Sequence, residues 1–468
     1  MISFSIYDYI VIILYFIGVI YIGFRTKTID KNNFDYLVAG RSITLPAFVA
    51  TLVSTFYGGI LGIGEFTYRY GISSWIMNAF PYYFFITLFA LFLAKKIRKA
   101  ELYTIADKLD ITYGKKVSIF GASLIFLLVT PAPYILMLGI LTGIIFGWSL
   151  IVSMLICLIV SIVFLFKGGL RADVKVNILE FVLMFLGFGI ILPFCYFKLG
   201  GISYLTNNLP QSHTSLMGGN SIGYLFVWFF LGMWALVDPS FHQRCYAAKN
   251  ESTAKKGIFV SLIFWFIFDF MTTVSGLYAY AHIKNLDNPA MSYPLLANDI
   301  LPSVAKGFFF VGMIATIMST FHSFLFISAT TLGKDIICRI KNIADDKNNF
   351  TKIGILISSV LSILIAILIP SVVQIWYTIG SLTIPSLLIG IISSYSRKLT
   401  INRNFILSAM IVSFLFSFVS FIFGNINKIN DIPNYFFGLE PMYPGLFAGL
   451  LIYFIGLIFN TRKKIINE

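Results

Sequence analysis

The chain has 468 residues, of which 58% are hydrophobic and 12% charged, about half the charged share of a soluble domain. This composition excludes a soluble globular protein. No polar stretch is long enough to form a separate domain, so residues 1–468 are predicted to be a single integral membrane unit.

Long apolar stretches predict helices that cross a membrane. They run for about 17 to 30 residues without the alternation of barrel strands, and a helix satisfies its own backbone hydrogen bonds in hydrocarbon. The predicted fold class is therefore all-α with thirteen transmembrane helices. In chain order the stretches are 6–24, 44–70, 74–94, 117–146, 149–166, 177–197, 222–241, 258–281, 307–332, 353–369, 371–394, 405–423 and 443–459.

The basic residues predict the orientation in the membrane. Of the 34 Lys and Arg, 29 lie in the loops after odd-numbered stretches or in the C-terminal tail, and 5 lie in the other loops. Cytoplasmic loops carry the excess of Lys and Arg. We therefore expect a multi-pass protein of the cell (plasma or inner) membrane, with its N-terminus outside and its C-terminus in the cytoplasm. The net charge of +14 thus reflects topology, and no nucleic-acid partner is expected.

Two of the predicted helices are interrupted. Residues 57–64 read YGGILGIG, and each glycine weakens a helix by about 1 kcal/mol relative to alanine. The seventh stretch contains Gly232 and then Asp238-Pro239, where proline removes a backbone donor. Each interrupted helix begins a run of five, which predicts an inverted-repeat transporter with its site at the breaks. The alternative is that these glycines only allow close helix packing.

Four short stretches carry a resemblance to a known family. They are residues 36–42 (YLVAGRS), 167–172 (KGGLRA), 239–249 (PSFHQRCYAAK) and 315–320 (ATIMST), the last followed by Lys334-Asp335-Ile336. In this order they resemble the sodium:solute symporter family, which includes bacterial proline, pantothenate, sialic acid and sugar symporters and animal sodium/glucose cotransporters.

The resemblance implies the leucine-transporter type of fold. This is a five-plus-five inverted repeat, with one extra helix before it and two after it. Applied to this chain, the first helix and a cytoplasmic loop occupy 1–43, the repeats occupy 44–197 and 222–396, and the last two helices occupy 397–468.

A sodium site is predicted at the first break. Sodium is bound by several hard oxygens, and a broken helix frees carbonyls that otherwise accept hydrogen bonds within the helix. The resemblance implies the carbonyls of Ser54, Tyr57 and Thr316 and the hydroxyls of Ser319 and Thr320 as ligands. The alternative is that the two hydroxyls bond only to carbonyls of their own helix.

The sequence also departs from the family. Many relatives carry Thr-Asp and then Gln in the sixth helix, where this chain has Val176, Asn177 and Glu180. The resemblance associates that Asp with a second sodium or with ion release, so we expect one sodium per cycle. His322 adds a positive charge when it is protonated, and Asp173 could replace the lost carboxylate but is expected nearer the cytoplasmic end.

Five residues are predicted by family position to contact the solute. They are Tyr57, Gly59, Asn78, Trp234 and Tyr377, and Trp234 falls where sugar-transporting relatives place an aromatic gate. The alternative is that these aromatic side chains are ordinary core residues. The chemical identity of the solute cannot be deduced from these positions.

The predicted function is sodium-coupled symport of a small organic solute into the cell by a monomer. Na+ is the only metal expected, and no catalytic residues are expected, because the sequence shows no nucleotide-binding loop, metal-ligand cluster or nucleophile elbow. Glu65 is expected to pair with Arg69, and the alternative is that it binds a substrate amine or carries a proton. Glu180 and Asp269 suit either a polar network or proton binding, so a proton-coupled symporter of the same fold is the alternative.

Overall fold

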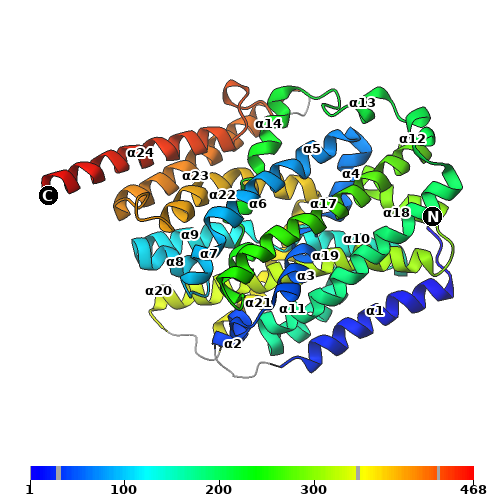
Figure 1. The fold of residues 1–468 in the computed structure, drawn as a ribbon, viewed down its shortest axis with the longest axis horizontal. Coiled ribbons are helices and arrows are strands. Elements are labelled where there is room, and N and C mark those ends of the chain that lie inside the picture. The colour runs from blue at the N-terminus through cyan, green and yellow to red at the C-terminus, as the bar shows by residue number, and fades with distance from the viewer. Residues whose placement is uncertain (1, 28–32, 344–347, 430–432, 468) are drawn as a thin grey trace.

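The computed structural model describes residues 2–27, 33–343, 348–429 and 433–467. Within these residues the protein is helical and contains no strand, apart from one isolated backbone bridge. The helices run roughly along one direction, so that α1 starts at one end of the bundle and α24 finishes at the other (Figure 1). The all-helical fold predicted from composition is confirmed.

The structure has eleven helical segments that are long and apolar enough to cross a membrane, or up to twelve with the bent pair α3 and α4. The α-helices are α1 (Ile6–Arg25), α2 (Asn33–Val38), α3 (Leu45–Phe56), α4 (Ile60–Tyr70), α5 (Ser73–Asn78), α6 (Phe80–Phe92), α7 (Ala94–Lys99), α8 (Ile105–Tyr113), α9 (Lys115–Leu128), α10 (Ala132–Phe146), α11 (Leu150–Leu199), α12 (Ile202–Asn208), α13 (Gln211–Thr214), α14 (Ile222–Leu231), α15 (Trp234–Val237), α16 (Pro239–Ala247), α17 (Glu251–His282), α18 (Ser292–Ile300), α19 (Ala305–Thr330), α20 (Arg339–Lys341), α21 (Asn349–Leu368), α22 (Val372–Ser394), α23 (Arg403–Ile426) and α24 (Met442–Asn467).

Helix α11 contains both the fifth and the sixth predicted stretches. Its 50 residues are interrupted by non-helical backbone at Gly169, where φ is 51° and ψ is −141°. Along the first arm, the contacts run in the same direction as α19, from 161 with 318 to 164 with 322. Along the second arm, they run in the opposite direction, from 180 with 322 to 187 with 312. The arms are therefore antiparallel, and each is long enough to cross hydrocarbon about 30 Å thick. The total of thirteen crossings stays a prediction.

The first break is shorter than the glycine-rich sequence suggested. Helices α3 and α4 are bent by 59° around Tyr57–Gly59, and the helix resumes at Ile60. A Cβ at Gly58 would overlap the Thr320 side chain, and one at Gly59 would overlap the Trp376 ring. Glycine is needed at these two positions because neighbouring side chains approach the backbone closely. The remaining glycines of the run lie inside α4.

The second break divides the seventh predicted stretch into three pieces. Helix α14 ends at Leu231, α15 is a single turn from Trp234 to Val237, and α16 begins at Pro239. Asp238 precedes the proline in an extended conformation, and its side chain accepts a hydrogen bond from the Ser240 amide at 2.7 Å. Both interruptions predicted from Gly and Pro are confirmed.

The fourth predicted stretch is also divided, although no break is predicted there from the sequence. The stretch 117–146 was predicted as one helix, but α9 ends at Leu128 and α10 begins at Ala132. Pro131 and Pro133 account for the interruption, because proline disfavours helical backbone at the residue before it and removes an amide donor.

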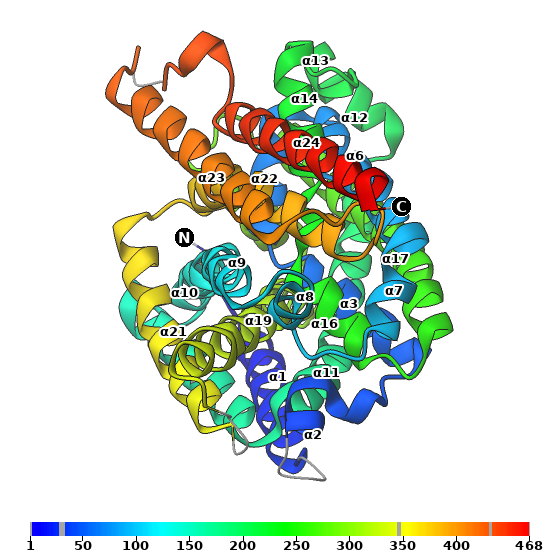
Figure 2. The ribbon, with the colours of Figure 1, turned by 90° about the vertical axis from the view of Figure 1, so that its left-hand side faces the viewer.

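Helix α19 forms the centre of the bundle. All residues of its most apolar 18-residue stretch are buried, compared with 28% of the residues in the corresponding stretches of α1 and α24. Figure 2 shows α19 lying between α8 and α9 on one side and α1 and α11 on the other. The side chains of the outer helices therefore face the surrounding medium, as expected for helices in contact with lipid.

The predicted cytoplasmic loops gather at one end of the bundle. In Figure 1, α2, α8 and α20 lie towards the left, where α24 also ends, and α12, α13 and α18 lie towards the right. Asp107 of α8 pairs with Lys334 at 2.5 Å and with Arg339. Burial opposes ionisation of Asp107, but the two cations outweigh it and hold the pKa of this carboxyl below its usual value.

A backbone link joins the two interrupted helices at this end. The Ile43 amide donates to the Ala247 carbonyl at 3.2 Å, and the Lys249 amide donates to the Ile43 carbonyl at 2.9 Å. Ile43 lies two residues before α3, and Ala247 is the last residue of α16. Two segments about 200 residues apart in sequence are thus paired through their main chains.

Candidate functional site

Two adjacent hydroxyls of α19 face the end of α3. Ser319 Oγ donates to the Ser54 carbonyl at 2.7 Å, and Thr320 Oγ1 donates to the Thr55 carbonyl at 2.6 Å. The two hydroxyls also lie 3.1 and 3.4 Å from the Thr316 carbonyl of their own helix. Contacts within α19 and across to α3 therefore coexist. Five neutral oxygens converge where α3 ends, because the hydrogen-bond ladder of the helix stops there; the Ser54 carbonyl also accepts the Tyr57 amide, at 3.4 Å.

Most of the predicted sodium ligands are brought together in this way. Ser54, Thr316, Ser319 and Thr320 are all members of the converging group, whereas the described contacts of Tyr57 involve its side chain and amide. The Thr55 carbonyl was missed. The end of α3 at Phe56 is what makes it available, and only the exact helix boundary could have identified it.

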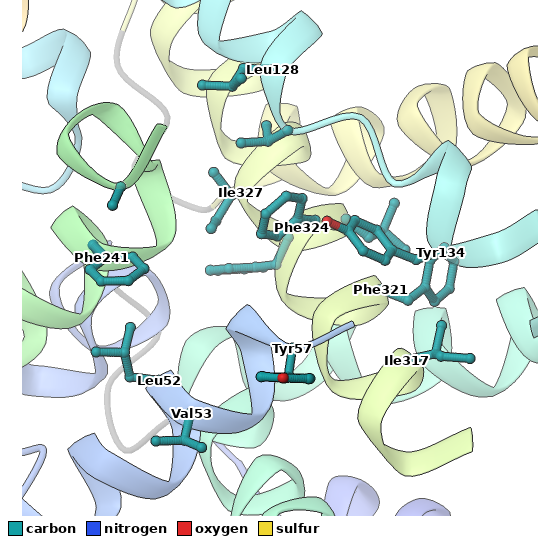
Figure 3. Packing of buried hydrophobic residues seen from close by; sticks show 14 of the residues in the cluster. Leu52, Val53, Tyr57, Leu128, Tyr134, Phe241, Ile317, Phe321, Phe324 and Ile327 are labelled. Carbon is teal, nitrogen blue, oxygen red and sulfur yellow. The ribbon is translucent and has the colours of Figure 1, made fainter. Parts of the chain in front are cut away.

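A cavity of about 150 Å³ is lined by residues of both breaks: Tyr57 and Gly59 belong to the first break, and Trp234 and Asp238 belong to the second. All five residues predicted to contact the solute line it: Tyr57, Gly59, Asn78, Trp234 and Tyr377. Figure 3 shows Tyr57 at the end of α3, near Phe324 of α19 and Tyr134 of α10, which also line the cavity. The rings of Tyr134 and Phe324 pack edge to face, with centroids 5.2 Å apart.

Aromatic rings form most of the cavity wall. Eleven of the twenty lining residues are aromatic; those not predicted are Phe56, Tyr82, Tyr83, Tyr134, Trp228, Trp265, Phe324 and Trp376. No local pattern distinguishes them from other aromatic residues, which make up 17% of the whole chain.

Two carboxylates also line the cavity. Asp269 of α17 accepts hydrogen bonds from the hydroxyls of Tyr57 and Tyr83, one on each carboxylate oxygen. Asp238 accepts the Ser240 amide and lies at the second break. The two side chains are 8% and 2% exposed, and neither takes part in an ion pair within the part of the chain that the structure describes.

A second group of buried charges lies on the other side of Thr55. Arg244 Nη2 is 2.8 Å from Asp173 Oδ2, and both side chains are fully buried. The same nitrogen donates to the Thr55 hydroxyl at 3.0 Å and to Ser323 Oγ at 2.8 Å. Asn177 Nδ2 lies 3.2 Å from Asp173 Oδ2. Asp173 is therefore in direct contact with the residue that replaces the family's Asp.

His322 extends this group towards α1. Its Nδ1 lies 3.3 Å from Asp173 Oδ1, and its Nε2 lies 2.9 Å from Glu180 Oε2. Tyr15 donates its hydroxyl to Glu180 Oε1 at 2.9 Å. We call Asp173, Glu180, Arg244 and His322 the charge cluster. Of the two alternatives considered for Glu180, its contacts show membership of a polar network.

Glu65 has an ordinary partner. Its carboxylate lies 3.1 Å from Arg69 Nη2, one turn later on α4, and both side chains are partly exposed. The predicted i,i+4 pair is confirmed, and Glu65 does not line the cavity.

Comparisons with known proteins agree with this arrangement. The chain is 25% identical over 461 residues to the sodium/pantothenate symporter of Haemophilus influenzae, covering 92% of each protein. It is 22% identical to the high-affinity choline transporter 1 of Drosophila melanogaster, covering 86% of this chain and 69% of that protein. The solved structure of a Na+-coupled sialic acid symporter superposes with a TM-score of 0.82 at 16% identity, covering 97% of this chain and 98% of that one.

The model of the sodium:solute symporter family matches residues 36–412, which contain both breaks, the hydroxyl pair and the charge cluster. The matched family and these similar proteins are transporters, not enzymes. The chain belongs to the sodium:solute symporter family.

Proposed function

We propose that this protein carries a small organic solute into the cell together with sodium, as a monomer that alternates between outward and inward access. The observation that carries the proposal is the position of the five converging oxygens. They lie at the end of α3, and Tyr57, the residue that follows α3, lines the cavity. An ion and a solute bound there would favour the same backbone arrangement, which is the physical basis of coupling.

Sodium is assigned to the oxygens of Ser54, Thr55, Thr316, Ser319 and Thr320, with the Tyr57 carbonyl as a further ligand. These oxygens are neutral and hard, which suits a cation of low charge. The solute is assigned to the cavity, with Tyr57, Gly59, Asn78, Trp234 and Tyr377 among its contacts. Tyr57 links the two sites through its position at the end of α3.

Sodium binding to the purified protein tests this proposal. Ser319→Ala and Thr320→Ala each leave a buried partner unmet, which costs about 1 to 3 kcal/mol and lowers sodium affinity roughly tenfold or more. Ser328→Ala is the matched control, since Ser328 is also on α19 but bonds to Ser358 at 3.0 Å. Unchanged binding of radioactive sodium by the double variant S319A/T320A would show that the site is misplaced.

We assign one sodium to each cycle because no free carboxylate is available for a second one behind Thr55. Asp173 is already paired with Arg244 at 2.8 Å, and Asn177 provides only a neutral amide. Two sodium ions side by side in a medium of low dielectric constant would repel each other strongly without a carboxylate to balance them.

We further infer thirteen crossings, with the N-terminus outside. Asn207 and Asn342 lie in exposed positions on opposite sides of the predicted membrane, and all four native cysteines are buried. A cysteine at Asn207 should react with an impermeant maleimide on intact cells, and one at Asn342 should not. The reverse pattern would overturn the orientation.

Proton coupling is the second candidate, and His322 favours it. A neutral imidazole has one donor and one acceptor nitrogen, yet both nitrogens of His322 face carboxylate oxygens. A protonated His322 would pair with both carboxylates, whereas a neutral His322 that donates from Nε2 to Glu180 leaves Nδ1 without a hydrogen bond in the described structure. Arg244 and Tyr15 are the other charged or titratable groups in contact with the two carboxylates. Uptake into proteoliposomes with an imposed sodium or proton gradient separates the two candidates.

A further inference from the structure

We propose that the transported solute is a small organic cation, an amine or quaternary ammonium compound, whose charge is balanced by Asp269 and Asp238. This inference rests on the proposed function, because it takes the cavity as the solute site. The cavity has uncompensated negative charge, cation-binding aromatic walls and a suitable size.

The charge of the cavity is the first observation. Asp238 and Asp269 are the only ionisable carboxyls in its described lining, and that lining contains no Lys, Arg or His. Arg244 attracts Asp238 electrostatically without forming an ion pair with it, because its Nη2 bonds to Asp173 at 2.8 Å within the charge cluster. Buried carboxylates in a membrane protein are costly unless a positive group neutralises them. A cationic solute would supply that group.

The hydrogen bonds of Asp269 favour its charged form. Each of its oxygens accepts a tyrosine hydroxyl, from Tyr57 on one side and Tyr83 on the other. A protonated carboxyl would have to use one oxygen as a donor, whereas a carboxylate accepts at both. The tyrosines thus position the carboxylate at the cavity wall and leave its charge for the solute.

The aromatic wall is a separate observation that points to the same chemistry. Nine of the lining residues are Trp or Tyr, namely Tyr57, Tyr82, Tyr83, Tyr134, Trp228, Trp234, Trp265, Trp376 and Tyr377. The electron-rich faces of these rings attract cations, and several such rings around one site are the usual means of binding quaternary ammonium groups. Aromatic rings without acid groups would suit a sugar or an apolar solute equally well. The combination with two carboxylates favours a cation.

The size of the cavity and one amide define the solute further. A volume of about 150 Å³ corresponds to about five water molecules at liquid density, so the solute has on the order of five to ten non-hydrogen atoms. Asn78 lines the cavity, and its Nδ2 is buried without an acceptor in the described structure. A hydroxyl or carbonyl oxygen on the solute would satisfy this donor.

Charge balance also relates the solute to sodium. The sodium ligands are neutral oxygens, so the positive charge of the ion has no counter-charge within its own site. One sodium and one monovalent cationic solute together neutralise the two cavity carboxylates. We expect a sodium-to-solute flux ratio of one and a charge-to-solute ratio of two.

Thermal stability of the purified full-length protein tests the solute class. The panel consists of choline, tetramethylammonium and primary amines of up to ten non-hydrogen atoms, the neutral choline isostere 3,3-dimethylbutan-1-ol, zwitterionic betaine and anionic pantothenate. Each compound is added in sodium chloride and in potassium chloride. At least one cation should raise the Tm in sodium, because a ligand that binds only the folded state stabilises it by mass action. The isostere and pantothenate should not raise the Tm.

Charge-removing variants connect this result to the carboxylates. Asp269→Asn and Asp238→Asn should each raise the dissociation constant of the cation at least tenfold. Asparagine at position 238 can still cap α16, so this variant keeps the local fold even if Asp269→Asn does not. Glu65→Gln is the matched control, because its carboxylate is paired with Arg69 outside the cavity, and it should bind the cation normally.

Two results would overturn the inference. One is stabilisation by the neutral isostere or by pantothenate equal to that by its cationic counterpart, and the other is failure of every cation in the panel. Stabilisation by sodium alone, and its loss in S319A/T320A, tests the proposed symport separately. If sodium stabilises the protein and the cations do not, only the solute class is wrong. If choline binds but sodium has no effect, the sodium coupling is wrong.

Discussion

The charge cluster and the cavity both contain buried carboxylates, but the groups that contact these carboxylates differ in charge. In the cluster, Asp173 lies 2.8 Å from Arg244, and Glu180 lies 2.9 Å from His322. In the cavity, the described hydrogen bonds of the Asp269 carboxylate come from the neutral hydroxyls of Tyr57 and Tyr83. The cluster carboxylates are thus paired with cations of the chain. The Asp269 carboxylate has no ion pair within the described residues, which is the arrangement that the proposed cationic solute requires.

The two regions should therefore respond in opposite ways to the loss of one charge. Removing a partner from the cluster leaves an isolated buried charge, whereas removing a carboxylate from the cavity removes a charge that was already isolated. The following predictions are ordered by expected size.

The largest effect is expected for Arg244→Gln. It leaves Asp173 without its cation and should lower the free energy of unfolding by about 3 to 5 kcal/mol. Asp269→Asn should leave thermal stability unchanged or raise it. Arg69→Gln, which breaks the partly exposed pair with Glu65, is the control and should cost about 0 to 1 kcal/mol. Equal losses for R244Q and D269N, measured as the Tm in detergent, would remove the distinction between the two regions.

Adding Asp173→Asn to Arg244→Gln should restore part of the lost stability. The double variant replaces a lone buried charge by two neutral groups that can still hydrogen bond. Residues in direct contact show interaction energies of about 0.5 to 3 kcal/mol in double-mutant cycles. Additive effects of the two substitutions would mean that the pair at 2.8 Å contributes nothing to stability.

The dependence of uptake on sodium should be simple. Because Asp173 is already paired with Arg244 and no free carboxylate lies behind Thr55, the initial uptake rate should rise with a Hill coefficient near one. Asn177→Asp combined with His322→Ser adds a carboxylate and removes a positive charge, and it should raise the coefficient towards two. A wild-type coefficient clearly above one, with two sodium ions carried per solute, would show that the cluster accepts a second ion.

The smallest effect is expected for Tyr83→Phe. The ring remains in the cavity wall, and only the hydroxyl bonded to Asp269 is lost. One hydrogen bond contributes about 0.5 to 1.5 kcal/mol, so affinity for a cationic solute should change by no more than about tenfold. Isothermal titration with that cation provides the measurement. A complete loss of binding would assign Tyr83 a larger part than positioning the carboxylate.

The sequence was most informative where the signal is local. Hydropathy located the spanning helices, and Gly58, Gly59 and Pro239 marked both breaks, because glycine and proline act on their own stretch of backbone. The hydroxyls of Ser319 and Thr320 were found through a short motif resemblance. The division at Pro131 was missed because a surrounding run of apolar residues concealed it.

The rest depended on contacts between distant segments. Asp173 and Arg244 are 71 residues apart, and Asp269 meets Tyr57 across 212 residues. Neither distance can be deduced from a pattern in one segment, since the neutralisation of a carboxylate is decided by what packs against it. From the sequence, Asp269 therefore suits either a polar network or proton binding, and no local pattern indicates that it lies at a cavity.

The main-chain link at Ile43 has a mechanical consequence. Two hydrogen bonds of 3.2 and 2.9 Å join the backbone just before α3 to the backbone at the end of α16. Any rotation that separates Ser54 and Thr55 from the hydroxyls of α19 must carry α16 with it or break this link. The two broken helices are thus mechanically linked at one end, so that in the proposed cycle the release of sodium and the opening of the cavity wall at Asp238 would be parts of a single displacement.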